Sequence, residues 1–286
     1  MDQKFIDLYD NYTHGGMSRR AFFDRLAMMA GGTAAATALL STLQCNYALA
    51  DTIAENDPRV AGEMVTFKAG DQDVSGYLVK PATGGKFPSV VLVHQNRGLN
   101  PHISDVARRL AVAGYLTLAV DFLSPGGGTP ADEDKAREMI VALNADDVTN
   151  WAKGAVAYLH QHPAGNDKVG AVGFCWGGGV IGRLAVSDPT LDAGVVYYGQ
   201  QPPADSVPNI HAPLLLHYAG LDERIDAGIP AFEEALKNNG KDYAIYMYEG
   251  ANHAFTDDTQ AARYNKAAAD LAWGRTLAFF QKYLAA

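Results

Sequence analysis

A cysteine between two glycines is the first candidate for chemistry in this sequence. The segment Gly173-Phe174-Cys175-Trp176-Gly177 has the spacing glycine, any residue, nucleophile, any residue, glycine, and it joins an apolar run to a helical pattern. Small residues are needed there because a tight strand-to-helix turn presses the backbone against its neighbours and exposes the nucleophile. The N–H groups and dipole at the start of the helix would stabilise a thiolate. The segment therefore favours a nucleophilic Cys175 over a buried structural cysteine.

An acid and a base are expected downstream of such a nucleophile, in that order, each after a later strand. Asp222 directly follows the run LLLHYAGL, and His253 follows YAIYMYEGAN. His253 would take the thiol proton and later activate water, while Asp222 would hold the imidazole tautomer and stabilise its cation. Taken alone, His253 would be read as a surface residue and Asp222 as a turn or helix-capping residue. Together with Cys175 they predict a catalytic triad.

Acyl transfer by this triad also requires two backbone donors for the oxyanion. The N–H of Trp176, directly after the nucleophile, is one candidate. The loop VLVHQNRGLN, which follows an early apolar run, offers the N–H of Asn96 as the second. Three aromatic residues near these positions are candidates for the walls of the acyl pocket: Phe122, Tyr198 and Phe255.

The elements that must position these residues alternate from Ala61 onward. The segments GEMVTFKAG and VSGYLVKPA alternate apolar and polar residues, which indicates an antiparallel pair of strands. Amphipathic helical stretches then alternate with the apolar runs FPSVVLVH, YLTLAVDF, KVGAVGF, AGVVYYG, APLLLHYAG and DYAIYMYEG. Continuous apolar strands between helices predict an α/β fold with a mostly parallel central sheet, flanked by helices on both faces. Ligands bind at the carboxyl ends of such strands, where the triad residues stand.

Composition restricts the class of protein. The chain has 286 residues, 48% of them hydrophobic, which is enough for one large core and an extension. Its formal net charge of -9 and the lack of a long basic block argue against nucleic acid or an anionic membrane as partner. A small-molecule substrate is therefore expected. Cys45 and Cys175 show no metal-like spacing, so a structural zinc site is not expected. The oligomeric state is not indicated.

Residues 1–50 form a separate segment before this body. Arg19 and Arg20 are followed by an uncharged stretch, 26–50, that ends in Ala-Leu-Ala. This pattern resembles a twin-arginine export signal and predicts a periplasmic protein of residues 51–286. In the alternative, the segment is retained as N-terminal helices of a cytoplasmic protein. The stretch is too rich in Gly, Ala and Thr for a convincing membrane span, so stable insertion is not expected.

The span from about Val60 to the C-terminus resembles the dienelactone hydrolase family of the α/β-hydrolases. The segments GFCWGGG, HQNRGLNPHI, GLDERI and GANHAF carry the resemblance. It implies an α/β-hydrolase domain over residues 51–286. It also implies hydrolysis of a small lactone or carboxylic ester through a thioester on Cys175, without a metal or organic cofactor.

Two positions depart from the family's pattern. The family's glutamate that pairs with the cysteine corresponds to Gln95, whose amide cannot pair as a charge, so thiol activation would fall on His253 and the helix dipole. The family's arginine four residues after the histidine corresponds to Asp257. Arg97 and Arg137 are then the candidates to hold a substrate carboxylate. These departures leave open a weakly active or non-catalytic binding protein on the same scaffold.

Overall fold

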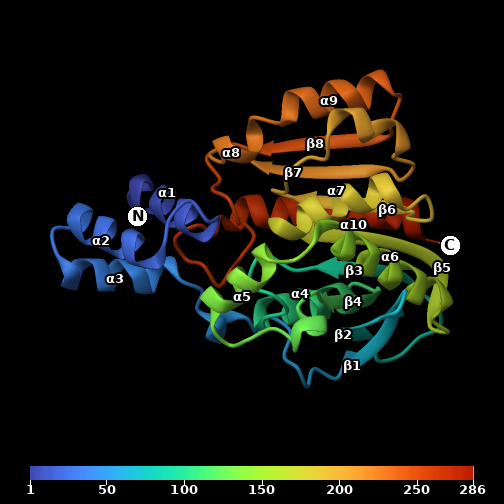
Figure 1. Cartoon of the computed structure of the whole chain (residues 1–286). Coiled ribbons are helices and arrows are strands. Elements are labelled where there is room, and N and C mark those ends of the chain that lie inside the picture. Colours follow the sequence, from blue (N-terminus) through green and yellow to red (C-terminus); the bar gives the residue numbers. More distant parts are fainter. Residues whose placement is uncertain (286) are drawn as a thin grey trace.

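The computed structural model describes residues 1–285, and its main body is a single eight-stranded sheet between two layers of helices (Figure 1). The strands are β1 (Val60–Ala69), β2 (Gln72–Pro81), β3 (Phe87–Val93), β4 (Leu116–Asp121), β5 (Gly165–Phe174), β6 (Ala193–Tyr197), β7 (Leu214–Ala219) and β8 (Tyr243–Tyr248). They lie in the order β1-β2-β4-β3-β5-β6-β7-β8. β2 runs antiparallel to β1 and β4, and all other neighbours are parallel. The predicted mostly parallel sheet is confirmed.

Two hydrophobic cores, one on each face, explain why the central strands are apolar along their whole length. On one face lie α6 (Ala145–Gln161), α7 (Trp176–Ser187) and α9 (Ile229–Asn238). On the other lie α4 (Pro101–Val112) and α10 (Lys266–Leu284). Every residue of β4 and β7 is buried, as expected for parallel strands covered by helices on both sides. Two short helices, α5 (Glu133–Val141) and α8 (Glu223–Asp226), lie in the loops after β4 and β7.

Three helices precede the sheet and form the segment that we call the N-terminal extension, residues 1–50. They are α1 (Gln3–Thr13), α2 (Arg19–Ala30) and α3 (Thr33–Leu43). Ser18 accepts a hydrogen bond from the Ala21 N–H at the start of α2, and Gly31, at a φ of 84°, ends that helix. A small core of its own holds the extension together: Ile6, Tyr9, Phe22, Leu26, Ala36 and Leu43.

The extension lies beside the loops at the carboxyl edge of the sheet (Figure 1). The Asn46 N–H donates to the Thr259 carbonyl at 2.8 Å, and the Arg263 guanidinium pairs with Asp10 at 2.9 Å. No single helix within residues 1–285 has the length and hydropathy to cross a membrane. Arg19–Ala30 and Thr33–Leu49 meet the criterion only as a pair, with a bend of 114° between them.

Candidate active site

Cys175 lies at the sharp turn between β5 and α7, in a conformation that few non-glycine residues adopt. Its φ is 55° and its ψ is -116°. A Cβ at Gly173 would collide with the Gly177 carbonyl, and a Cβ at Gly177 would meet the carbonyls of Val93 and His94. The two glycines are therefore required by close backbone approach, which leaves the cysteine at the tip of the turn.

His253 and Asp222 meet beside this cysteine. The Nδ1 atom of His253 lies 2.5 Å from Oδ2 of Asp222, and both side chains are buried. Asp222 follows β7 and caps α8, and His253 stands in the loop after β8. Since the carboxylate accepts the Nδ1 proton, Nε2 is the nitrogen left to face the cysteine, and it has no hydrogen-bond partner among the described residues.

The structure also brings a residue to the site that sequence reasoning missed, His14 at the C-terminal end of α1. Its Nε2 atom lies 3.4 Å from Sγ of Cys175, and its ring packs edge-on against His253 with centroids 4.7 Å apart. The Nδ1 atom of His14 lies 2.8 Å from the Asp10 carbonyl and 3.3 Å from the Asp10 carboxylate. The only local signal was that Asp10 and His14 stand one helical turn apart.

The two imidazoles control the charge of the thiol. Burial raises the pKa of Cys175, but the charges of His253 and His14 outweigh it and hold that pKa well below its usual value. Burial lowers the pKa of His253, but the negative charges of Cys175, Asp222 and Asp10 raise it to about 10. The pKa of His14 is also raised, because Cys175 and Asp10 outweigh its burial. These contacts shift the thiol toward its ionised form and both imidazoles toward their protonated forms.

A cavity of about 270 Å³ opens at Cys175. Its lining includes His14, His253, Trp176, Tyr198 and Asn96. Three arginines also line it: Arg137, Arg183 and Arg224. This cavity is therefore lined by six of the residues proposed from sequence: Cys175, His253, Trp176, Asn96, Arg137 and Tyr198.

The two oxyanion candidates flank the nucleophile from different elements. Trp176 is the first residue of α7, so its N–H has no acceptor within the helix. Asn96 lies in the loop after β3, and its side-chain amide donates to the Thr13 carbonyl at 2.8 Å. Gln95, next to it, is buried, its amide nitrogen has no hydrogen-bond partner within residues 1–285, and it is not part of the cavity lining.

Several proposed substrate contacts do not reach the cavity. Arg97 is buried 3.1 Å from the Glu133 carboxylate and 3.1 Å from the Tyr9 hydroxyl, so its charge is already paired. Phe122 packs against Trp176 from behind the lining, and Phe255 packs against Tyr198. All three pack inside the protein, which spacing along the chain does not reveal.

Asp257, at the position of the family's arginine, also lies outside the lining. Its carboxylate accepts hydrogen bonds from Thr259 and Gln260 and faces His102. Burial raises the pKa of Asp257, but His102, Thr259 and Gln260 outweigh it and hold that pKa below its usual value. The Asp257 carboxylate is thus occupied inside the protein and does not face the cavity at Cys175.

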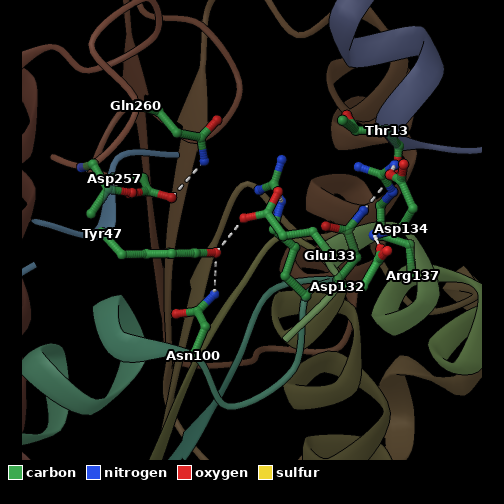
Figure 2. Close-up of polar contacts among 12 residues, drawn as sticks. Thr13, Tyr47, Asn100, Asp132, Glu133, Asp134, Arg137, Asp257 and Gln260 are labelled. Carbon is green, nitrogen blue, oxygen red and sulfur yellow. Dashed lines mark hydrogen bonds and ion pairs between the residues drawn. The ribbon is translucent and has the colours of Figure 1, made fainter. Parts of the chain in front are cut away.

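Polar contacts along α5 join the extension to the cavity wall (Figure 2). The Tyr47 hydroxyl lies between Glu133, at 2.5 Å, and Asn100, at 3.1 Å. Arg137 pairs with Asp134. Its guanidinium also lies 4.5 Å from the centre of the Tyr12 ring. One wall of the cavity is thus held in place by residues of the extension.

Two groups of side chains have the composition of a metal site. The first group is His14, Cys175 and His253, and the second is His102, Asp257 and Asp258. Within each group, one potential ligand atom from every residue lies within 4.8 Å of those from the other two. The sequence pattern had suggested no metal site, because neither group is contiguous in the chain.

Comparison with known proteins places the body of the chain in a family. A model of the dienelactone hydrolase family matches residues 74–284. The chain is 32% identical over 239 residues, 79% of its length and 96% of the relative's, to a Bradyrhizobium protein described as a probable 2-oxo-3-(5-oxofuran-2-ylidene)propanoate lactonase. A crystal structure of dienelactone hydrolase from Anabaena variabilis superposes with a TM-score of 0.63 at 24% identity, covering 79% of this chain and 99% of that one. That superposition confirms the predicted α/β-hydrolase fold.

Two further matches concern shorter parts of the chain. It is 53% identical over 107 residues, 36% of its length, to an Escherichia coli K12 protein described as "Putative hydrolase fragment YghX", of which 92% is covered. A second family model, described as YqhI-like, matches residues 1–32, within the extension. The body and the extension are thus matched by different models, and by its body the chain belongs to the dienelactone hydrolase family of lactone and ester hydrolases.

Proposed function

We propose that this hydrolase cleaves a small lactone or carboxylic ester through a thioester on Cys175, with His253 as acid and base and Asp222 as the residue that orients it. The observation that carries the proposal is the His253–Asp222 contact of 2.5 Å, which leaves Nε2 of a buried histidine free beside a strained, cavity-lining cysteine. This is the arrangement that nucleophilic catalysis requires.

The chemistry proceeds in two acyl transfers. The Cys175 thiolate attacks the substrate carbonyl carbon, and the resulting oxyanion is held by the N–H groups of Trp176 and Asn96. The carbon–oxygen bond to the leaving alkoxide breaks, and the alkoxide takes the proton from Nε2 of His253. Neutral His253 then takes a proton from water, whose hydroxide attacks the thioester. Collapse releases the carboxylic acid and restores the thiolate beside protonated His253.

The charge of the cavity supports a substrate that carries a carboxylate. Arg183 has an Nε with no hydrogen-bond partner among the described residues, and Arg224 is 44% exposed with its nearest carboxylate oxygen 3.9 Å away. Both line the cavity with Cys175. Two cations that are not tightly paired favour an anionic acyl group over a neutral one.

We also propose that the extension stays on the working enzyme. His14 contacts the nucleophile, and Tyr9 and Phe22 of the extension are buried. These contacts favour retention over removal of residues 1–50 by export processing. Sequencing the N-terminus of the chain from its native host tests this: a start before His14 supports retention, and a start near Asp51 supports export.

Turnover of a p-nitrophenyl ester tests the triad. Cys175→Ala and His253→Ala should each lose at least about 1,000-fold in kcat, as removal of triad members does in related chemistry. Cys45→Ala is the matched control, since burial raises the pKa of that thiol to about 11 and it should remain inert. Undiminished turnover in both triad variants would refute the mechanism, and a folded wild type without turnover would support a binding role.

A further inference from the structure

We propose that His14, Cys175 and His253 form a binding site for a zinc-class divalent metal ion. One ligand atom from each residue lies within 4.8 Å of the other two. Two imidazoles and a thiolate are ligands that zinc and similar borderline ions prefer over calcium or magnesium. The extension supplies one of the three ligands, so the site exists only in the chain that retains it.

The spacing of the ligand atoms suits a tetrahedral ion. Nε2 of His14 and Sγ of Cys175 are 3.4 Å apart. A tetrahedral zinc with bonds of about 2.3 Å to sulfur and about 2.0 Å to nitrogen separates those two atoms by roughly 3.5 Å. Nε2 of His253 is buried and has no hydrogen-bond partner among the described residues, so it is available as the third ligand.

The groups behind the ligands also match a metal site. Nδ1 of His253 is held by the Asp222 carboxylate, and Nδ1 of His14 by the carbonyl and carboxylate of Asp10. Metal-binding histidines are oriented in this way, with one nitrogen on a carboxylate or carbonyl and the other on the ion. Both rings are therefore oriented with Nε2 toward the sulfur. The cavity of about 270 Å³ beside Cys175 leaves room for a fourth, exchangeable ligand.

The second group, His102 with Asp257 and Asp258, lacks these properties. Its Asp258 carboxylate is already paired with Arg109. Its Asp257 carboxylate is occupied by Thr259 and Gln260. This group is an ion-pair network, and it provides a matched control for the first.

The consequence for catalysis rests on the proposed function. A bound ion takes the electron pair of the Cys175 sulfur and that of Nε2 of His253, so neither can act on an ester. Metal binding and hydrolysis are therefore mutually exclusive, and His14 sets the metal sensitivity of the enzyme.

Cobalt absorbance tests the site without any need for turnover. Reduced, metal-free full-length protein titrated with Co²⁺ should develop a thiolate-to-cobalt charge-transfer band at one ion per chain, and Zn²⁺ should displace it. Cys175→Ser should lose the band. His14→Ala and His14→Gln should each weaken metal binding at least about 100-fold. Loss of a group that only orients a ligand weakens binding up to about 100-fold, and loss of a ligand should weaken it at least as much. His102→Gln and His211→Ala should bind as the wild type does.

Circular dichroism and melting of both His14 variants show whether the chain and its extension remain folded. A folded wild type without the band, or folded His14 variants with undiminished affinity, would overturn the site. The inhibition has its own readout: Zn²⁺ should abolish ester turnover over the concentration range in which it binds, and a chelator should restore it. Turnover that is unchanged or raised by bound Zn²⁺ would overturn the inhibition alone. Turnover in chelator reports on the triad separately.

Discussion

The Cys175 sulfur lies beside two imidazoles that come from opposite ends of the chain. His14 precedes Cys175 by 161 residues, and His253 follows it after three further strands of the sheet. In the family pattern a glutamate accompanies the cysteine, but at that position this chain has Gln95, which carries no charge. His14 is placed to stabilise the thiolate by a charge-assisted hydrogen bond, which a neutral amide could not do as strongly.

At the residue scale, His14→Ala should slow alkylation of Cys175 by iodoacetamide about 10- to 100-fold, because a hydrogen bond to a charged group contributes about 1.5–3 kcal/mol. The measurement is the rate of adduct formation by mass spectrometry, in the presence of a chelator. His211→Ala, which changes an exposed histidine, is the control. An unchanged rate in His14→Ala would show that His253 and the helix dipole suffice.

A second prediction concerns the charge of the substrate. Arg183→Ala should raise KM for an ester whose acyl group carries a carboxylate, about 10-fold or more, since a charge-assisted contact is removed. KM for the neutral ester of the same length should change little. Arg59→Ala, whose guanidinium pairs with Asp57 instead of lining the cavity, is the matched control. Equal effects on both esters would argue against carboxylate recognition.

At the element scale, the turn between β5 and α7 depends on how closely α7 approaches the end of β3. Gly177→Ala places a methyl group against the carbonyls of Val93 and His94, so we expect a loss of about 1–3 kcal/mol in the free energy of unfolding. Gly274→Ala, in α10 with no atom within 4 Å of the new methyl, should be neutral or stabilise by about 0.5–1 kcal/mol. Denaturant titration of both variants measures the difference. Equal stabilities would contradict the packing argument.

Much of this site was predictable at the element scale, and the reasons are local. Asp222 and His253 each follow an apolar strand, and parallel strands bring their carboxyl ends to one edge. Arg183 could have been found, because it lies seven residues after Trp176 and hence on the same face of α7. The position of His14 could not have been predicted, since nothing in the sequence of α1 indicates that the C-terminal end of this helix lies beside the end of β5. Arg97 was misplaced because its ion pair with Glu133 is a tertiary contact.

At the scale of the whole molecule, the extension borders the candidate active site, because His14 contacts Cys175 and lines the same cavity. Arg263 fixes it from the body, pairing with Asp10 at 2.9 Å and lying over the ring of Tyr9 at 5.3 Å. Asp10 in turn orients His14. A chain of contacts thus runs from Arg263 through Asp10 and His14 to the Cys175 sulfur.

Arg263→Ala should loosen the extension from the body, and it tests whether this contact affects catalysis. We expect faster trypsin cleavage within residues 19–25 and a fall in kcat/KM of about 10-fold, the effect of losing one oriented charged contact. Arg275→Ala removes an arginine of similar chemistry, stacked on Tyr246 at 3.7 Å, and should change neither readout. Faster cleavage without loss of activity would show that the extension is dispensable for catalysis.

The mass of the protein during turnover of an activated ester tests most directly whether Cys175 is the nucleophile. His253→Gln should form the thioester more slowly and hydrolyse it more slowly still, so that an acyl group accumulates. Peptide mapping should find this acyl mass on Cys175, and prior alkylation of Cys175 should abolish it. Turnover without any adduct on Cys175, or an adduct on another residue, would contradict the central claim.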